Sequence, residues 1–298
     1  MKAWAWLLAA ACAVGGLLLS GCGAEKPAAP VVSALAGNWL LVGPMPTNML
    51  GLTPTGTSLA VTFDVNGNNI VAAGVVNDFC ISVEFGSPGI PVIGSVAADG
   101  SFTLATPPNS LGAVSIRGTV PRASGGPWPG SYTVSLTSPF PPKCNTNLSG
   151  TFTATSFPLI GGVYVGTGST QTTVNGVSTA TQATFQATLQ QGATVMDPSG
   201  KPLSRSSALL GSIRVQGSPC FTSGVTDSTR PGRVEGNRVD AIFTMDDGST
   251  LVLLGSLADA TETRLTENVA IVTGGQCAIN GPTIYQLPEL NRQSQQGS

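Results

Sequence analysis

SLAVTFDVNGNNIVAAGVV, residues 58–76, is the stretch that decides the fold class of this chain. In its first half the apolar residues Leu59, Val61 and Phe63 alternate with smaller or polar ones, which is the pattern of a half-buried β-strand. A second apolar run follows after Asn66-Gly67, a dipeptide that supplies the positive φ angles of a tight turn. The stretch therefore predicts an antiparallel β-hairpin.

Similar short runs occur on the C-terminal side of this hairpin. They are SFTLA (101–105), AVSIRGTV (113–120), SYTVSLT (131–137) and SGTFTATS (149–156). Asp99-Gly100 and Asp247-Gly248 add two more hairpin turns. The best helical candidate, residues 257–268, is long enough for two turns at most, and no segment sustains a 3.6-residue apolar period. We therefore predict an all-β protein.

The chain also contains an internal repeat. LAGNWLLVG (35–43) aligns with LIGGVYVGTG (159–168), which places Gly37 on Gly162 and Trp39 on Tyr164. GSVAADGSFTLA (94–105) parallels GRVEGNRVDAIFTM (232–245). A repeat of this kind predicts two tandem antiparallel domains from an internal duplication, at residues 35–157 and 158–290. The strand pattern fits a β-barrel and a β-sandwich equally, and residues 291–298 are expected to form a disordered tail.

The N-terminus carries an export signal. Lys2 precedes an apolar run from Ala3 to Leu19, which is shorter than the roughly 20 residues of a membrane span and fits a signal peptide. Leu19-Ser20-Gly21-Cys22 resembles the lipobox of bacterial lipoproteins. That resemblance implies cleavage of residues 1–21 and acylation of Cys22, with palmitate or a similar fatty acid. The alternatives are an ordinary signal peptide and an uncleaved anchor.

The resemblance also implies a location. Gly23 stands where an Asp would resemble an inner-membrane retention signal, so the lipoprotein pattern implies an envelope protein of the outer membrane. Residues 22–34 are rich in Ala and Pro and predict a tether to the membrane.

Four further cysteines remain for an oxidising compartment, namely Cys80, Cys144, Cys220 and Cys277. The repeat gives each half one cysteine in its middle and one before its last strand, which selects the pairs Cys80–Cys144 and Cys220–Cys277 among the three pairings possible. Each disulfide would be worth roughly 4 kcal/mol in the chain-entropy account. No two of these cysteines lie within four residues of each other, so no metal site is predicted.

Composition argues against catalysis and against nucleic acid as a partner. The chain has no His, which removes the commonest general base, and its formal net charge of −2 offers no basic face for phosphates. Carboxylates fall mostly in hairpins, and the run 227–240, with three Arg and three acidic residues, predicts a solvated hairpin. We expect no cofactor.

Gly37-Asn38-Trp39 resembles the Gly-x-Trp opening of lipocalins. The whole chain resembles the uncharacterised repeat-containing lipoproteins of acidobacteria, a family that implies no activity. The lipocalin resemblance implies a ligand cavity beneath Trp39 or Tyr164. Trp128, between Pro127 and Pro129, is a candidate to stack on a sugar or a peptide, or to cap its own domain.

These observations predict a non-catalytic envelope lipoprotein that binds a small apolar or glycan ligand. The alternative is a structural or envelope-assembly protein, and a His-free hydrolase is the third class. The sequence leaves the oligomeric state open.

Overall fold

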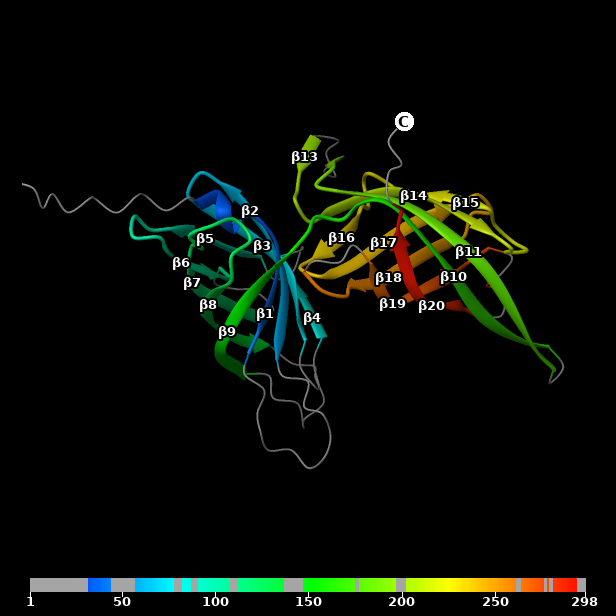
Figure 1. Ribbon diagram of the computed structural model, residues 1–298, viewed down its shortest axis with the longest axis horizontal. Helices are drawn as coiled ribbons and strands as arrows, with labels where there is room; N and C mark the ends of the chain where they lie inside the picture. The colour runs from blue at the N-terminus through cyan, green and yellow to red at the C-terminus, as the bar shows by residue number, and fades with distance from the viewer. Residues whose placement is uncertain are drawn as a thin grey trace, which may run out of the picture. The chain divides into compact units, whose positions relative to one another are not determined.

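The computed structural model describes residues 32–43, 57–77, 82–86, 91–107, 112–136, 147–174, 177–196, 202–260, 264–275, 278 and 281–293. The chain after Pro30 forms one compact unit. Within the described residues the regular structure is a short 3₁₀ turn, η1 (Val32–Leu35), and β-strands (Figure 1). No helix among the described residues is long and apolar enough to cross a membrane.

The first half of the chain closes into a barrel. Its nine strands are β1 (Gly37–Val42), β2 (Ser58–Asn66), β3 (Asn69–Asn77), β4 (Ser82–Phe85), β5 (Val92–Val96), β6 (Ser101–Ala105), β7 (Gly112–Thr119), β8 (Trp128–Leu136) and β9 (Asn147–Phe157). They follow the order β2-β1-β9-β8-β7-β6-β5-β3, and the pairing of β2 with β3 closes the ring, while β4 adds a ninth strand beside β3. Every pairing is antiparallel, as hairpin-sized connections require.

The second half repeats this architecture. Its strands are β10 (Gly161–Val174), β11 (Val177–Gln191), β14 (Ala208–Gln216), β15 (Ser223–Val225), β16 (Gly232–Glu235), β17 (Arg238–Met245), β18 (Thr250–Leu257), β19 (Leu265–Thr273) and β20 (Thr283–Arg292). The order is β11-β10-β20-β19-β18-β17-β15-β14, closed by the pairing of β11 with β14 and extended by β16. A separate hairpin, β12 (Thr194–Met196) with β13 (Pro202–Ser204), is inserted between β11 and β14.

The two barrels share one strand order, in which β15 takes the ring position of β5 and β16 the outer position of β4, and this supports the predicted internal duplication. In the first barrel, β3 pairs with β5 near its start and with β4 near its end. In the second, β14 pairs with β16 near its start and with β15 near its end. Gly37 and Gly162, aligned by the repeat, both adopt a positive φ, at 113° and 103°. The fold is thus all-β, with two closed eight-stranded antiparallel barrels and an extra strand on each.

Aromatic side chains fill the core of the first barrel around Trp128. The ring centroid of Trp128 lies 5.2 Å from that of Phe152, 5.3 Å from Phe102 and 5.8 Å from Trp39. Gly118, on the neighbouring strand, makes room for this indole, because a Cβ there would lie 2.6 Å from a ring carbon of Trp128. The second core is built mainly from aliphatic residues, with the pair Phe185 and Tyr285 at 5.2 Å.

The hairpins predicted at Asn66-Gly67, Asp99-Gly100 and Asp247-Gly248 are all present, with each Gly at positive φ. Two expectations were wrong. The helical candidate at 257–268 is instead the end of β18 and the start of β19, with residues 261–263 outside the described part. Residues 291–293 do not belong to the predicted tail, because β20 continues to Arg292 and the backbone N–H of Gln293 donates to the carbonyl of Val163, and residues 294–298 lie outside the described part.

Candidate functional site

The two barrels meet through a buried pair of side-chain amides. Asn38, on β1, donates from Nδ2 to Oε1 of Gln191 at 2.9 Å, and Gln191, at the end of β11, donates from Nε2 to Oδ1 of Asn38 at 2.7 Å. Both side chains are buried, with Asn38 only 2 % exposed. Gln191 also accepts from the backbone N–H of Ile160 and donates to the carbonyl of Ser206. All the hydrogen-bonding capacity of the Gln191 amide is therefore used at the junction.

Further hydrogen bonds fix β2 of the first barrel against the second. The buried hydroxyl of Thr62 lies 2.9 Å from Oδ1 of Asn38 and 2.8 Å from the carbonyl oxygen of Val234. Two positions along β2, Asp64 accepts from the backbone N–H of Ser206 at 2.8 Å. Buried polar groups with satisfied partners specify one relative placement, because any sliding would leave them unpaired.

The turn between β16 and β17 presses against the first barrel. Gly236 has a φ of 59°, and a Cβ at this position would lie 2.7 Å from the backbone nitrogen of Val61 and would also clash with the carbonyl oxygen of Trp39. Two independent reasons favour glycine at this position, namely the left-handed backbone conformation of the turn and the close approach to β1 and β2.

This hairpin also carries charged groups into the junction, which corrects our prediction of a solvated hairpin for residues 232–240, whereas residues 227–230 are exposed as expected. Arg233 forms an ion pair with Glu84 of β4 at 2.6 Å, and Arg238 donates to Oδ1 of Asn77 at 2.8 Å. Glu235 is only 8 % exposed, and its Oε1 has no hydrogen-bond partner among the described residues. The charged face of the hairpin thus meets the first barrel, which the local sequence does not reveal.

Burial changes the titration of these acids. Desolvation, followed by repulsion from Glu84, raises the pKa of Glu235 to about 7. The same two causes raise the pKa of Asp240, whereas Arg233 and Arg238 act in the opposite direction on both carboxyls. The junction therefore holds two carboxyl groups whose ionisation is disfavoured by burial.

Beside the amide pair lies a cleft of about 520 Å³. Its described lining comes from both halves of the chain and from the connection between them: Ala36, Gly37, Asn38, Trp39, Ser124, Gly125, Ser156, Phe157, Pro158, Leu159, Gly192, Ser206 and Ala260. None of these residues is charged. Leu159 is 60 % exposed at the cleft, an unusual position for a large aliphatic side chain. The cleft is concave, mainly apolar and edged by hydroxyl groups, which are the features of small-molecule sites between domains.

Two of the three predicted ligand-contact residues, Trp128 and Tyr164, do not line the cleft. Trp128 is the first residue of β8 and, like Trp39, is buried in the first core, where Trp39 donates from Nε1 to the carbonyl of Leu35 at 2.8 Å. Tyr164 is buried in the second core, and desolvation raises its pKa. Trp128 thus lies inside the first core, where it is not exposed for a sugar to stack on it. Of the three residues, only Trp39 also borders the cleft.

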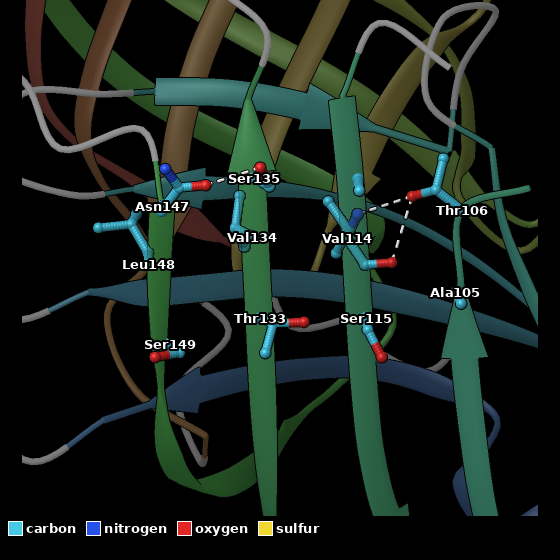
Figure 2. A pocket seen from close by; sticks show the side chains of 11 residues that line it. Ala105, Thr106, Val114, Ser115, Thr133, Val134, Ser135, Asn147, Leu148 and Ser149 are labelled. Carbon is cyan, nitrogen blue, oxygen red and sulfur yellow. Dashed lines mark hydrogen bonds between the residues drawn. The ribbon is translucent and has the colours of Figure 1, made fainter. Parts of the chain in front are cut away.

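A second concave surface lies on the outer wall of the first barrel (Figure 2). Ser115 of β7, Thr133 of β8 and Ser149 of β9 stand side by side in register. They line two adjoining hollows of about 330 and 340 Å³. We call the outward side chains of β6 to β9 the hydroxyl face; they are Ser101, Thr103, Ala105, Ala113, Ser115, Arg117, Thr119, Pro129, Ser131, Thr133, Ser135, Asn147, Ser149, Thr151, Thr153 and Thr155. Among these sixteen residues there is no aromatic ring on which a sugar could stack.

Of the cysteines for which we predicted a role, only Cys220 lies among the described residues. Cys22, Cys80, Cys144 and Cys277 lie outside the described residues. Cys220 is half-buried against the second core and is disulfide-bonded. The pairing of Cys220 with Cys277, and that of Cys80 with Cys144, stays a prediction. Among the described residues no group of three His, Cys, Asp or Glu side chains is placed to hold a metal ion.

Fold and junction together define a tandem β-barrel protein with an interbarrel cleft. No family model and no curated protein matches the chain. It is similar to a solved structure from Nostoc punctiforme PCC 73102, a protein of unknown function from the DUF3598 family, at 12 % sequence identity. The match covers 88 % of this chain and 97 % of that chain with a TM-score of 0.21, a level of likeness that carries no functional inference.

Proposed function

We propose that this protein is a non-catalytic, lipid-anchored envelope protein whose interbarrel cleft binds a small uncharged ligand. The observation that carries the proposal is the cleft of about 520 Å³ lined by both halves of the chain, beside the amide pair of Asn38 and Gln191. A cleft walled by a hydrogen-bonded junction is pre-organised, which lowers the entropic cost of binding.

The lining defines the chemistry of the ligand. Phe157, Pro158 and Leu159 offer apolar contact, and the hydroxyls of Ser124 and Ser206 offer hydrogen bonds. Because no charged side chain is among the described lining residues, a charged ligand would lose its hydration without gaining an ion pair. An amphiphile with an uncharged, hydroxylated head group fits this lining best. No titratable side chain lines the described cleft either, so it offers no general acid or base.

The ligand would therefore bind at the junction of the two barrels and not inside a barrel. Trp39, Trp128, Phe63, Phe102 and Phe152 pack against each other in the first barrel, where a lipocalin-like ligand was expected. The cleft, in contrast, is open at the surface beside Leu159.

Binding is tested with octyl glucoside, used below its micelle concentration as a probe with an apolar chain and an uncharged sugar head. Saturating probe should raise the thermal midpoint, since a ligand at a hundred times its dissociation constant adds about 2.7 kcal/mol. Leu159→Ser should abolish the rise. Val71→Ser is the matched control, because Val71 is also an exposed aliphatic residue, at 46 %, and does not line the cleft. An equal response in both variants would place the ligand elsewhere.

Anchoring is tested separately by the intact mass of the protein extracted from membranes. We expect a chain that starts at Cys22 and carries acyl groups, whereas Cys22→Ala should remain unprocessed or soluble. Two or more chains are required for lasting attachment, since one acyl chain holds a protein only marginally. An uncleaved wild-type chain, or one released without acyl groups, would disprove the anchoring.

A further inference from the structure

Four neighbouring strands of the second barrel carry a band of aliphatic side chains on their outer surface. Ile242 of β17 pairs with Val252 of β18, Val252 with Ile271 of β19, and Ile271 with Ile284 of β20. Leu254 and Val269 are paired in the next row. We call these six residues the aliphatic face.

All six point away from the core, because the residues that alternate with them are buried. Their buried neighbours include Ala241, Leu253, Ala270 and Tyr285. Ile284 is 46 % and Leu254 is 37 % exposed, and the other four are partly exposed. Single exposed aliphatic residues need no explanation, but a contiguous patch of six on the outer wall of a barrel indicates an interaction surface.

The first barrel shows that the fold does not require this patch. Its corresponding strands, β6 to β9, carry the hydroxyl face at the equivalent outer positions. The two copies of the duplicated domain have the same core alternation, and they differ in what they present to the outside. The aliphatic face therefore reflects a role of the second barrel that the first does not share.

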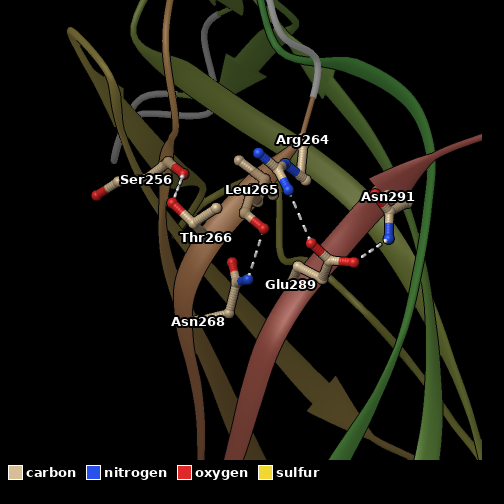
Figure 3. Close-up of polar contacts among 7 residues, drawn as sticks. All are labelled: Ser256, Arg264, Leu265, Thr266, Asn268, Glu289 and Asn291. Atoms are coloured by element: carbon tan, nitrogen blue, oxygen red, sulfur yellow. Dashed lines mark hydrogen bonds and ion pairs between the residues drawn. The ribbon is translucent and has the colours of Figure 1, made fainter.

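Polar rows border the aliphatic face along both ends of the strands. One row holds Thr244, Thr250 and Thr273. The other crosses the four strands as Arg238, Ser256, Thr266 and Glu289, and its last three members appear in Figure 3, where Arg264 reaches Glu289 at 3.0 Å. Arg238 thus stands at the β17 side of this row and Glu289 at the β20 side.

We propose that the aliphatic face joins two copies of this chain face to face, about a two-fold axis that runs parallel to the strands between β18 and β19. With this axis, each row of one copy lies against the same row of the other copy. The order of the strands is reversed between the copies, so that β17 of one faces β20 of the other. Ile242 then meets Ile284, Val252 meets Ile271, and Leu254 meets Val269. At the rim, Arg238 meets Glu289 of the second copy, twice by symmetry.

The chemistry of the rows favours a second copy over other occupants. Two sheets with β-branched outer faces pack about 10 Å apart, as in sandwich proteins, and an isologous interface must be self-complementary in this way. The rim carries Arg238, which also donates to Asn77, at its β17 side and the exposed ion pair of Glu289 with Arg264 at its β20 side, so that Arg238 of one copy would join this pair in the reversed copy. A bilayer would not gain from covering the exposed ion pair of Glu289 with Arg264. The cleft shares no residue with the aliphatic face, so this inference is independent of the proposed function.

The test is sedimentation velocity on the full chain, with Cys22→Ala in every sample to prevent lipid-driven association. At concentrations from about 1 to 100 µM we expect a dimer. Val252→Thr with Ile271→Thr keeps the shape and the strand propensity of both positions, and it should weaken the dimer by tenfold or more because each hydroxyl would be buried against an aliphatic partner. The matched control, Thr133→Val with Thr151→Val on the hydroxyl face, should sediment as the wild type does.

A charge reversal makes the test specific to the proposed axis. Arg238→Glu should weaken the dimer through repulsion from Glu289, and adding Glu289→Arg should restore it. A monomeric wild type at 100 µM would overturn the proposal, whether or not the chain binds phosphatidylglycerol vesicles. So would a dimer that is unaffected by the two threonine substitutions, or a charge reversal that the second change fails to rescue. Thermal midpoints of all variants show whether each remains folded.

Discussion

Asn38 and Gln191, which are 153 positions apart in the sequence, exchange two hydrogen bonds of 2.9 and 2.7 Å inside the junction of the two barrels. Asn38 lies on the face of β1 opposite to the core residues Trp39 and Leu41, whereas Gln191 ends the row of β11 residues that faces the second core. The pair therefore joins two cores into one cooperative unit and sets one wall of the cleft. Because residues of both halves line the cleft, its shape depends on how this contact places one barrel against the other.

Gln191→Ala should lower the free energy of unfolding by about 3 kcal/mol. The substitution leaves the backbone N–H of Ile160 buried without its partner and removes two hydrogen bonds from the Asn38 amide, which keeps Pro158 and Thr62 as partners. A buried polar group that loses its partner costs about 1–3 kcal/mol. Urea titration provides the measurement. In a double-mutant cycle with Asn38→Ala, the double variant should lose less stability than the sum of the two single losses, with a coupling energy of about 1 kcal/mol or more. Strict additivity would show that the two amides do not act as a pair.

Gly236→Ala should destabilise the junction more than a glycine substitution at an ordinary turn. Alanine would strain the left-handed φ of 59° and would also clash with the backbone of β1 and β2. Gly248→Ala is the matched control, because Gly248 has a φ of 81° but open space around its Cβ position. We expect the Gly236 variant to lose about 2 kcal/mol more than the control in urea titrations. Equal losses would mean that the close approach is not rigid.

Local patterns in the sequence predicted the strands and hairpin turns well because alternation and turn chemistry are local properties. Leu59, Val61 and Phe63 face the core as their spacing requires, and Gly67 adopts the positive φ that Asn-Gly turns need. The repeat predicted the duplication through Gly37 and Gly162, whose special backbone conformation any second copy must keep. The choice between barrel and sandwich depended on the long-range pairs of β1 with β9 and of β10 with β20, which join the first and last strands of each half.

The junction could not be predicted in this way. Strand alternation turns Asn38 away from the core, and nothing local shows that a second barrel covers it. Glu235 and Asp240 alternate with Val234 and Val239 as solvent-facing residues of a hairpin would, yet the second barrel places them against the first. Buried contacts between domains depend on residues more than a hundred positions apart, so a single sequence gives no signal for them.

Non-reducing peptide mapping should link Cys220 to Cys277 and Cys80 to Cys144. Cys220 is already disulfide-bonded and lies against the second core. Replacing both Cys220 and Cys277 by Ser should cost about 4 kcal/mol, since the closed loop constrains the unfolded chain. A bridge between Cys220 and a cysteine of the first half would contradict the repeat on which the pairing rests.

Stability should fall as the pH rises through the range in which Glu235 titrates. The pKa of this carboxyl is about 7 in the folded protein and 4.5 as an ordinary Glu, so the folded state holds the extra proton between these values. The free energy of unfolding is then highest below pH 4.5 with respect to this group, decreases between pH 4.5 and 7, and stays low above, a change of about 3 kcal/mol. The raised pKa of Asp240 acts in the same direction.

Glu235→Gln isolates this contribution, because the amide keeps the shape and cannot ionise. We expect the variant to be more stable than the wild type at pH 8 and to lose most of the slope between pH 5 and 7 in urea titrations. Asp99→Asn is the control. The hydroxyl and the backbone N–H of Ser101 lower the pKa of the exposed Asp99. The stabilising effect of the Asp99 carboxylate is therefore lost only on acidification below its ordinary pKa of 3.8. A Glu235→Gln variant with an unchanged slope would show that Glu235 ionises freely and that the junction is open to water.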